Sequence, residues 1–378
     1  MSAIKLRIQS RHREHMGIIT SLDDFDWIED ESIDAEPLLD DPNITLYCLD
    51  QANKRAIFSA LPADIDLSSA PFMYQAQFDK AEFLVALPYA DFLGLAEAIP
   101  FDDRALLCLH NIGRCGSTVV ARALNEIDDV MALSEPDALT NFVKMNGLPP
   151  KERGDLLRAC ARWLCRPAIV RDHRRIVIKF RNQATAVMGL YVEALPQALH
   201  MFMYRNVIDW LASFHRLHVK RAALPKRYPR EQVIDQQASY YGCPREQIER
   251  LAHPSIESYR VLEGRAIGWL FMLEQYLELL DSGAKIAALR YEDLQSDRDA
   301  LLLALLQMMG LPSTGLNAAR RAFKSDAQAG TKLARDGGRG NTLALPEDQQ
   351  ATVRRLLATQ PLLNSADVIL PNTISVDA

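Results

Sequence analysis

Residues 109–124, "LHNIGRCGSTVVARAL", pass from an apolar run through a turn with two glycines into a helical pattern. An apolar run of this kind is typical of a strand that is covered on both faces of a parallel sheet. A turn containing Gly113 and Gly116 lets several backbone N–H groups point toward one place, and the helix that follows adds its N-terminal donors and dipole. The stretch therefore predicts a strand–loop–helix unit with an anion site at its turn.

Side chains in the turn favour the same interpretation. Arg114 carries a planar, permanently charged fork that suits phosphate oxygens, and Ser117 and Thr118 bring hydroxyl donors to the start of the helix. The nucleotide-hydrolase pattern G-x-x-x-x-G-K-[ST] is absent, because position 117 is serine and position 111 is not glycine. Losing that lysine argues against metal-assisted phosphoryl transfer. The alternative is an ordinary strand–turn–helix junction with a stray arginine.

The sequence after Arg104 alternates between strand-like and helix-like patterns. Five short apolar runs, each followed by a helical period, lie at residues 105–112, 130–136, 174–180, 198–205 and 285–294. Such alternation predicts an α/β fold in three layers (α/β/α), with a central parallel sheet and helices on both faces. We therefore expect a phosphate-loop domain over residues 101–378 and a small α+β appendage of unknown role over residues 1–100.

Composition narrows the classes of partner. A net charge of −6 gives no general attraction to nucleic acid or to an anionic membrane. No apolar run is long enough to span a bilayer, and the N-terminus lacks the apolar stretch of a secretion signal. The six cysteines show no CxxC pairing, so a reducing cytoplasm fits best. The acidic run at 21–41 is expected to be a solvated surface segment, with partner docking as the alternative.

A second anion site is predicted at "YRNVIDWLASFHR" (residues 204–216). Arg205 ends an expected strand, and Ser213 lies eight positions later on the following helix. The C-terminal ends of parallel strands share one edge of the sheet, so Arg205 should open onto the same crevice as Arg114. A ligand with phosphates at two ends would satisfy both arginines. The alternative is that Arg205 pairs with Asp209 on the first helical turn.

Three motifs in order, "GRCGST", "RNVIDWLAS" and "LRYEDL…LLLALLQMMGLP", resemble those of sulfotransferases that use 3′-phosphoadenosine-5′-phosphosulfate (PAPS). The resemblance covers roughly residues 104–350, and the loop arginine is similar to that of the protein-tyrosine branch and of many bacterial enzymes. It implies that Arg114, Cys115, Gly116, Ser117 and Thr118 hold the 5′-phosphosulfate. Cys115 stands where the pattern has serine, a change that leaves the backbone donors intact.

The resemblance also implies roles for other residues. Arg205 and Ser213 would grip the 3′-phosphate, with PAP as the product. Glu135 would be the base for the acceptor hydroxyl, and Lys179 would neutralise charge growing on the sulfuryl group and the bridging oxygen. Structural roles remain open as alternatives. Glu135 could cap the following helix or pair with a neighbouring arginine, and Lys179 could extend from its strand end to the solvent.

Other residues are further candidates for these tasks. Asp137 is the substitute base and His110 a weaker one, while Arg181 would share the anionic load. Family members also close the donor site with a C-terminal loop, for which Lys332, Arg335 and Arg339 are the candidates. Surface charge is the alternative for these three.

The sequence thus predicts a cytoplasmic, PAPS-dependent sulfotransferase that acts without a metal, since a sulfuryl group carries less charge than a phosphoryl group. The acceptor is a small molecule, a glycan or a peptide, and residues 217–262, charged and proline-rich, are expected to help line its side. Acceptor identity and oligomeric state stay open. Two rivals remain: a phosphate-loop kinase for a small molecule, with Arg114 replacing the lysine, and a non-catalytic nucleotide-binding module of the same fold.

Overall fold

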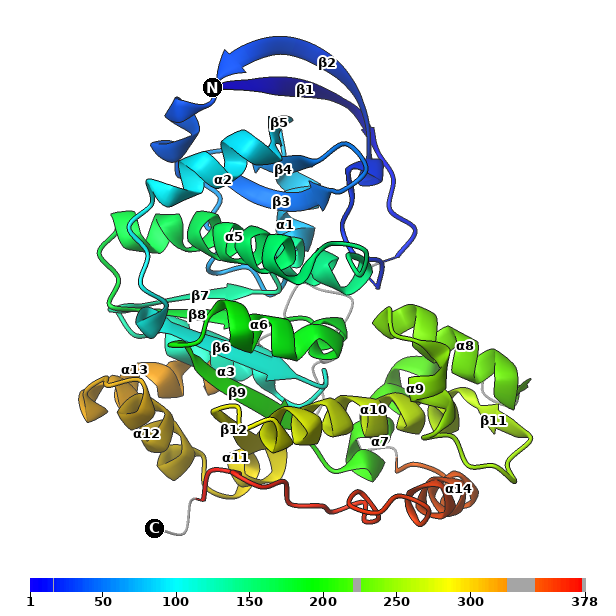
Figure 1. The fold of residues 1–378 in the computed structure, drawn as a ribbon. Coiled ribbons are helices and arrows are strands. Elements are labelled where there is room, and N and C mark those ends of the chain that lie inside the picture. Colours follow the sequence, from blue (N-terminus) through cyan, green and yellow to red (C-terminus); the bar gives the residue numbers. More distant parts are fainter. Residues whose placement is uncertain (16, 220–225, 325–343, 376–378) are drawn as a thin grey trace.

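A computed structural model describes residues 1–15, 17–219, 226–324 and 344–375. Its central element is a parallel sheet in the order β12-β9-β6-β8-β7 (Figure 1). The five strands are β6 (Leu106–Asn111), β7 (Val130–Ser134), β8 (Arg175–Lys179), β9 (Leu199–Tyr204) and β12 (Ile286–Arg290). All five predicted strands are confirmed. The chain leaves the central strand β6 for the edge strand β7 and later returns to β9 on its other side, so the strand order reverses beside β6. Ligand sites of open α/β sheets lie at such reversals, beyond the C-terminal strand ends.

Alternation of side chains along the strands explains why both faces are covered. Leu106 and Cys108 of β6 belong to one buried cluster, whereas Leu107 and Leu109 belong to another. A strand that buries both sets of side chains needs a layer on each face. Figure 1 shows α5, α6 and α10 across one face and α3 behind the other. The three-layer α/β/α prediction is therefore confirmed.

Helices follow each of the five strands, as the alternation predicted. The longer ones are α3 (Ser117–Asn125), α5 (Pro150–Val170), α6 (Met188–Ala194), α7 (Val207–Val219), α8 (Arg230–Tyr241), α10 (Val261–Asp281), α12 (Arg298–Met308) and α14 (Glu347–Leu357). The shorter ones are α4 (Asp137–Thr140), α9 (Arg245–Glu249), α11 (Tyr291–Ser296) and α13 (Leu316–Ala319), and a hairpin of β10 (Arg227–Pro229) and β11 (Ser258–Arg260) flanks α8 and α9. No helix within the described ranges is long and apolar enough to cross a membrane.

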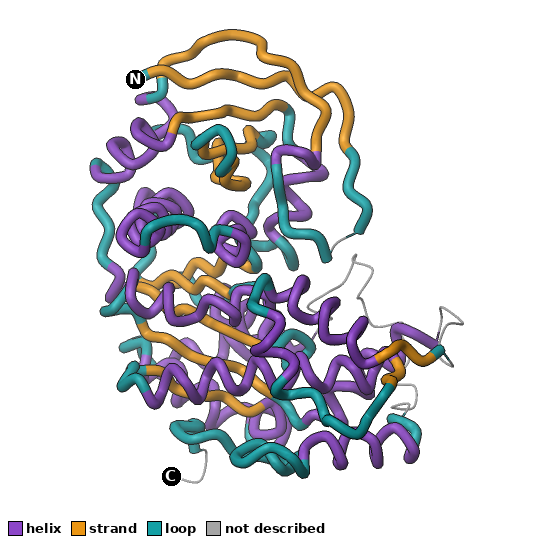
Figure 2. Tube along the Cα trace, turned by 45° about the vertical axis from the view of Figure 1, so that its right-hand side comes forward, coloured by secondary structure: helices purple, strands orange, loops and turns teal. Residues whose placement is uncertain are grey.

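The first hundred residues form a second, antiparallel sheet in the order β2-β1-β5-β4-β3 (Figure 1). Figure 2 shows its strands in orange at the N-terminal end of the molecule. Its strands are β1 (Ser2–Arg11), β2 (Phe25–Asp34), β3 (Ile44–Asp50), β4 (Arg55–Ala60) and β5 (Phe83–Pro88), with helices α1 (Met73–Lys80) and α2 (Tyr89–Glu97). The predicted α+β character of this part is confirmed. The acidic run is not a plain surface segment, because it includes the edge strand β2. Most of β2 is exposed, and charge along an edge strand discourages pairing with other chains.

Helix α5 lies between the two sheets and joins them. The Trp163 ring meets Phe58 of β4 at 4.9 Å and Phe92 of α2 at 6.1 Å between ring centroids. Arg166 of the same helix donates a hydrogen bond of 2.9 Å to the carbonyl of Ile44. One buried cluster runs without interruption from the N-terminal sheet through α5 to the parallel sheet. The division at residue 100 therefore stays a proposal about chain organisation, and the hydrophobic core is continuous across it.

Candidate active site

The loop after β6 has an unusual backbone. Gly113, Arg114 and Gly116 have φ angles of 70°, 53° and 84°, in the left-handed region. Side chains fix this shape: the amide oxygen of Asn111 accepts from the Gly113 N–H at 2.9 Å, and the Trp210 indole donates to the Gly113 carbonyl at 2.8 Å. Helix α3 begins directly after the loop, so its unpaired N-terminal N–H groups add to the loop amides. The loop has the backbone features of an anion site.

Gly116 is needed for packing as well as for its φ angle. A Cβ added there would lie 3.0 Å from the ring of Tyr291, at the start of α11. Tyr291 also lies under the Arg205 guanidinium, 4.1 Å from its centre to the ring centroid. The Glu292 carboxylate next to it accepts from the Asn206 N–H at 3.1 Å. The "RYEDL" element thus packs against both predicted phosphate sites: Tyr291 contacts the loop at Gly116 and the Arg205 guanidinium, and Glu292 binds the N–H of Asn206.

The other loop residues differ in exposure. Cys115 is fully buried, and burial raises the pKa of its thiol. A neutral thiol is only a weak hydrogen-bond donor, so the backbone N–H of Cys115 is its stronger donor to an anion. Ser117 is 3% exposed, whereas Thr118 is half-buried. Binding of a phosphosulfate by these residues stays a prediction.

Arg205 lies directly against the loop, as the shared strand edge predicted. Its Nη1 donates to the Arg114 carbonyl at 3.3 Å, and its own carbonyl accepts from the Trp269 indole at 2.9 Å. The Nε of Arg205 is buried without a hydrogen-bond partner among the described residues. A buried N–H of a charged group favours an acceptor, so Arg205 retains capacity for an anion.

Ser213 is less available. Its side chain is 2% exposed, and its Oγ donates to the Trp210 carbonyl of the same helix at 2.6 Å. Only the lone pairs of that hydroxyl remain for another partner, and these cannot donate to a phosphate oxygen. Contact between Ser213 and a 3′-phosphate would require its hydroxyl hydrogen to turn away from Trp210.

Glu135 and Lys179, predicted separately, lie together at the C-terminal edge of β7 and β8. The Lys179 ammonium is in direct contact with the Glu135 carboxylate, and the two side chains are 3% and 13% exposed. The Glu135 N–H also donates to the Lys179 carbonyl at 2.7 Å. Lys179 lies near the loop as well, because it pairs with Leu109 of β6, four residues before Gly113.

The backbone of Glu135 is strained. Its φ angle is 60°, a region that non-glycine residues seldom adopt and that costs on the order of 1–2 kcal/mol. Strain of this kind is often found at functional positions. The pair therefore combines a carboxylate, an ammonium and a strained backbone beside an anion loop.

The two alternative candidates for the base, His110 and Asp137, are both buried and already hydrogen-bonded. His110 is fully buried, bonded through Nε2 to His200 Nδ1 at 3.2 Å and stacked on Phe180. Burial and the His200 ring hold its pKa well below the usual range, so it is a neutral core residue. Asp137 is 1% exposed and accepts from Arg181 Nη1 at 2.7 Å and from the Thr20 N–H at 2.8 Å.

Arg181 is therefore part of a buried ion pair. Burial, the largest single effect, lowers the pKa of its guanidinium, but the Asp137 carboxylate together with Tyr74 and Glu135 raises the pKa overall. The predicted sharing of anionic load by Arg181 thus competes with this existing partner. Lys332, Arg335 and Arg339 lie outside the described residues. No group of three or more metal-ligating side chains occurs within the described part of the chain, and the expectation of a metal-free reaction stays a prediction.

Comparison with known proteins gives structural matches only. No family model and no curated protein matches the sequence. The chain is similar to a sulfotransferase from Alicyclobacillus acidocaldarius, with 15% identity, a TM-score of 0.38 and coverage of 67% of this chain and 90% of that one. It is also similar to mouse sulfotransferase SULT7A1 complexed with PAP (13% identity, TM-score 0.40, coverage 71% and 87%) and to STF9 from Mycobacterium avium (10%, 0.40, 72% and 81%).

All three matches have 15% identity or less and TM-scores of 0.40 or less. At such identities and TM-scores they carry no argument about activity, donor or acceptor.

Proposed function

We propose that this chain is a sulfotransferase that moves a sulfuryl group from PAPS to a hydroxyl or amine of an acceptor. The observation that carries the proposal is the buried contact between Glu135 and Lys179 at the same sheet edge as the phosphate loop. An anion loop alone would suit many phosphate compounds. A carboxylate–ammonium pair beside it supplies a base and a charge-neutralising group, which sulfuryl transfer requires.

The donor fits the residues at two places. At one end lie the left-handed loop and the helix start, with a glycine against which Tyr291 packs. At the other lies Arg205, which reaches the loop carbonyl and retains a buried Nε–H. A compound with phosphate oxygens at two ends would occupy both. PAPS is such a compound, whereas a nucleoside with a single phosphate chain is not.

The proposed reaction assigns one task to each catalytic residue. Glu135 accepts the proton of the acceptor hydroxyl, the acceptor oxygen bonds to sulfur, and the bond from sulfur to the phosphate oxygen breaks. PAP then leaves with the bonding electron pair. Lys179 holds the carboxylate in place beforehand and balances the negative charge that grows on the transferring group and on the leaving oxygen.

Calorimetric titration with PAP tests the donor assignment. Replacing either loop-side arginine removes charge-assisted hydrogen bonds, so Arg114→Ala and Arg205→Ala should each weaken PAP binding roughly 10–150-fold. Arg104→Ala is the matched control, because Arg104 is exposed and precedes β6 at the opposite end of the strand. Unchanged affinity in both site variants, or tighter binding of Mg·ATP than of PAP, would contradict the proposal.

A further inference from the structure

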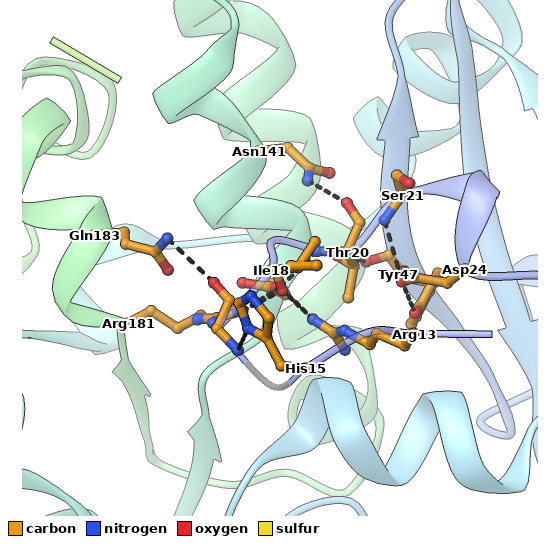
Figure 3. Close-up of polar contacts among 12 residues, drawn as sticks. Arg13, His15, Ile18, Thr20, Ser21, Asp24, Tyr47, Asn141, Arg181 and Gln183 are labelled. Carbon is orange, nitrogen blue, oxygen red and sulfur yellow. Dashed lines mark hydrogen bonds and ion pairs between the residues drawn. The ribbon is translucent and has the colours of Figure 1, made fainter. Parts of the chain in front are cut away.

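One segment of the N-terminal part of the chain, residues 13–20, makes several contacts at the catalytic edge. After β1 the chain runs past the ends of β7 and β8 before it enters η1 (Leu22–Asp24). Figure 3 shows the contacts along this run: Arg181 donates to the Ile18 carbonyl at 3.2 Å, and Gln183 donates to the Gly17 carbonyl at 3.4 Å. Both donors follow β8, two and four residues after Lys179.

Asp137 is the centre of these contacts. It lies two residues after Glu135, at the start of α4, with its side chain wholly buried. Its Oδ2 accepts from the Thr20 N–H at 2.8 Å and from Arg181 at 2.7 Å, and Arg13 Nη2 lies 3.7 Å away. Two of these three partners come from the N-terminal segment.

Arg13 is itself held firmly. Its side chain is 3% exposed, and its Nη2 donates to the Ile18 carbonyl. Its guanidinium lies 4.7 Å from the Tyr74 ring centroid, and that of Arg181 lies 4.6 Å from the same centroid. Buried cations of this kind need a counter-charge, and Asp137 lies between these two.

The consequence concerns Glu135. A left-handed glutamate does not keep its backbone conformation unless the residues around it impose it. The N–H of Glu135 donates a hydrogen bond to the Lys179 carbonyl, and two residues further along the chain Asp137 is held by its own hydrogen bonds. Releasing Asp137 would free the turn at Pro136 and let the carboxylate move away from Lys179.

We infer that Arg13 is a positioning residue, through which the N-terminal part of the chain holds the Glu135–Lys179 pair in place by way of Asp137. The segment that follows β1 then supports the active site, and the N-terminal part of the chain is not a passive appendage. The inference rests on the proposed function for its kinetic consequence, whereas its structural consequence stands by itself.

The structural test compares Arg13→Ala, Arg13→Lys and Arg11→Ala by hydrogen–deuterium exchange. Arg11 is the matched control, since it belongs to the same strand end and bonds the Phe78 and Ala81 carbonyls rather than Asp137. In Arg13→Ala the amides of residues 135–141 should exchange faster, in Arg13→Lys nearly as in the wild type, and in Arg11→Ala unchanged. Equal exchange in all three variants, or equal acceleration in both alanine variants, overturns the inference.

The kinetic test measures consumption of PAPS and affinity for PAP in the same variants. Displacement of reacting groups by about 1 Å costs on the order of 100-fold in rate, so kcat of Arg13→Ala should fall roughly 10–100-fold with PAP affinity unchanged within about twofold. A merely structural arginine would lower the melting temperature and leave kcat intact, which refutes positioning. If the wild type neither binds PAP nor consumes PAPS, the proposed function fails, and the exchange comparison still decides the role of Arg13.

Discussion

The strained backbone of Glu135 gives a prediction that can be worked out from one angle. Glu135→Ala and Glu135→Gly both remove the carboxylate and leave the Lys179 ammonium buried, at 3% exposure, without its partner. Leaving such a cation unpaired costs about 3–5 kcal/mol in either variant, so this loss cancels when the two are compared. Alanine keeps the steric strain of a φ of 60°, whereas glycine does not.

The two variants therefore differ in their free energy of unfolding by the backbone strain that glycine relieves, minus the extra conformational entropy of glycine in the unfolded chain. Relief of left-handed strain is worth about 1–2 kcal/mol, and the extra freedom of glycine in the unfolded chain returns roughly 0.5–1 kcal/mol of it. The midpoints of these ranges, about 1.5 and about 0.75 kcal/mol, leave Glu135→Gly the more stable variant by about 0.75 kcal/mol. Urea denaturation with a common slope measures this difference. Equal stabilities, or a more stable alanine variant, would refute the claim that the glutamate is held under strain for its chemistry.

Three further predictions concern the base, the loop and the core. Glu135→Gln keeps the shape of the side chain and removes its charge, so PAPS turnover should fall about 10²–10⁴-fold with PAP affinity retained; full turnover would place the base elsewhere. Gly116→Ala should weaken PAP binding and lower stability, because its Cβ would lie 3.0 Å from Tyr291 and its φ of 84° disfavours alanine. A PAP affinity equal to that of the wild type, measured by calorimetry, would contradict this prediction. Burial lowers the pKa of both His110 and His200. As the pH drops below about 6.5, these histidines therefore take up protons in the unfolded chain but not in the folded one, and the free energy of unfolding should fall. His110→Phe should flatten that fall in urea titrations at several pH values, and an unchanged slope would count against it.

Much of the fold followed from the sequence because its signals are local. Each parallel strand is a short apolar run, as at residues 174–180, and some helices end at a glycine. Helix α10, for example, ends just before Gly283, which has a φ of 85°. The N-terminal sheet was harder to predict, since β1 and β2 pair through a register with two shifts and most of β2 is exposed. Such strands lack the apolar alternation on which a sequence prediction depends.

In the candidate site, sequence reasoning found the residues that follow strand ends. Arg205, Glu135 and Lys179 were expected at one edge, and the structure brings the last two into contact. It missed Tyr291 as the support of Gly116 and Arg13 as a partner of Asp137, because both contacts join segments more than a hundred residues apart. No spacing rule links such segments. The only sequence signal was the companion motif "RYEDL", which marked Tyr291 without showing what it contacts.

The central claim is that the site grips a nucleotide by phosphates at two ends. Calorimetric titration of the unmodified protein with PAP and with adenosine 5′-phosphate tests it most directly, since the two ligands differ only in the 3′-phosphate. One charged phosphate held by Arg205 should make PAP bind roughly 10–150-fold more tightly. Equal affinities for the two ligands, or no detectable binding of PAP, would contradict the account.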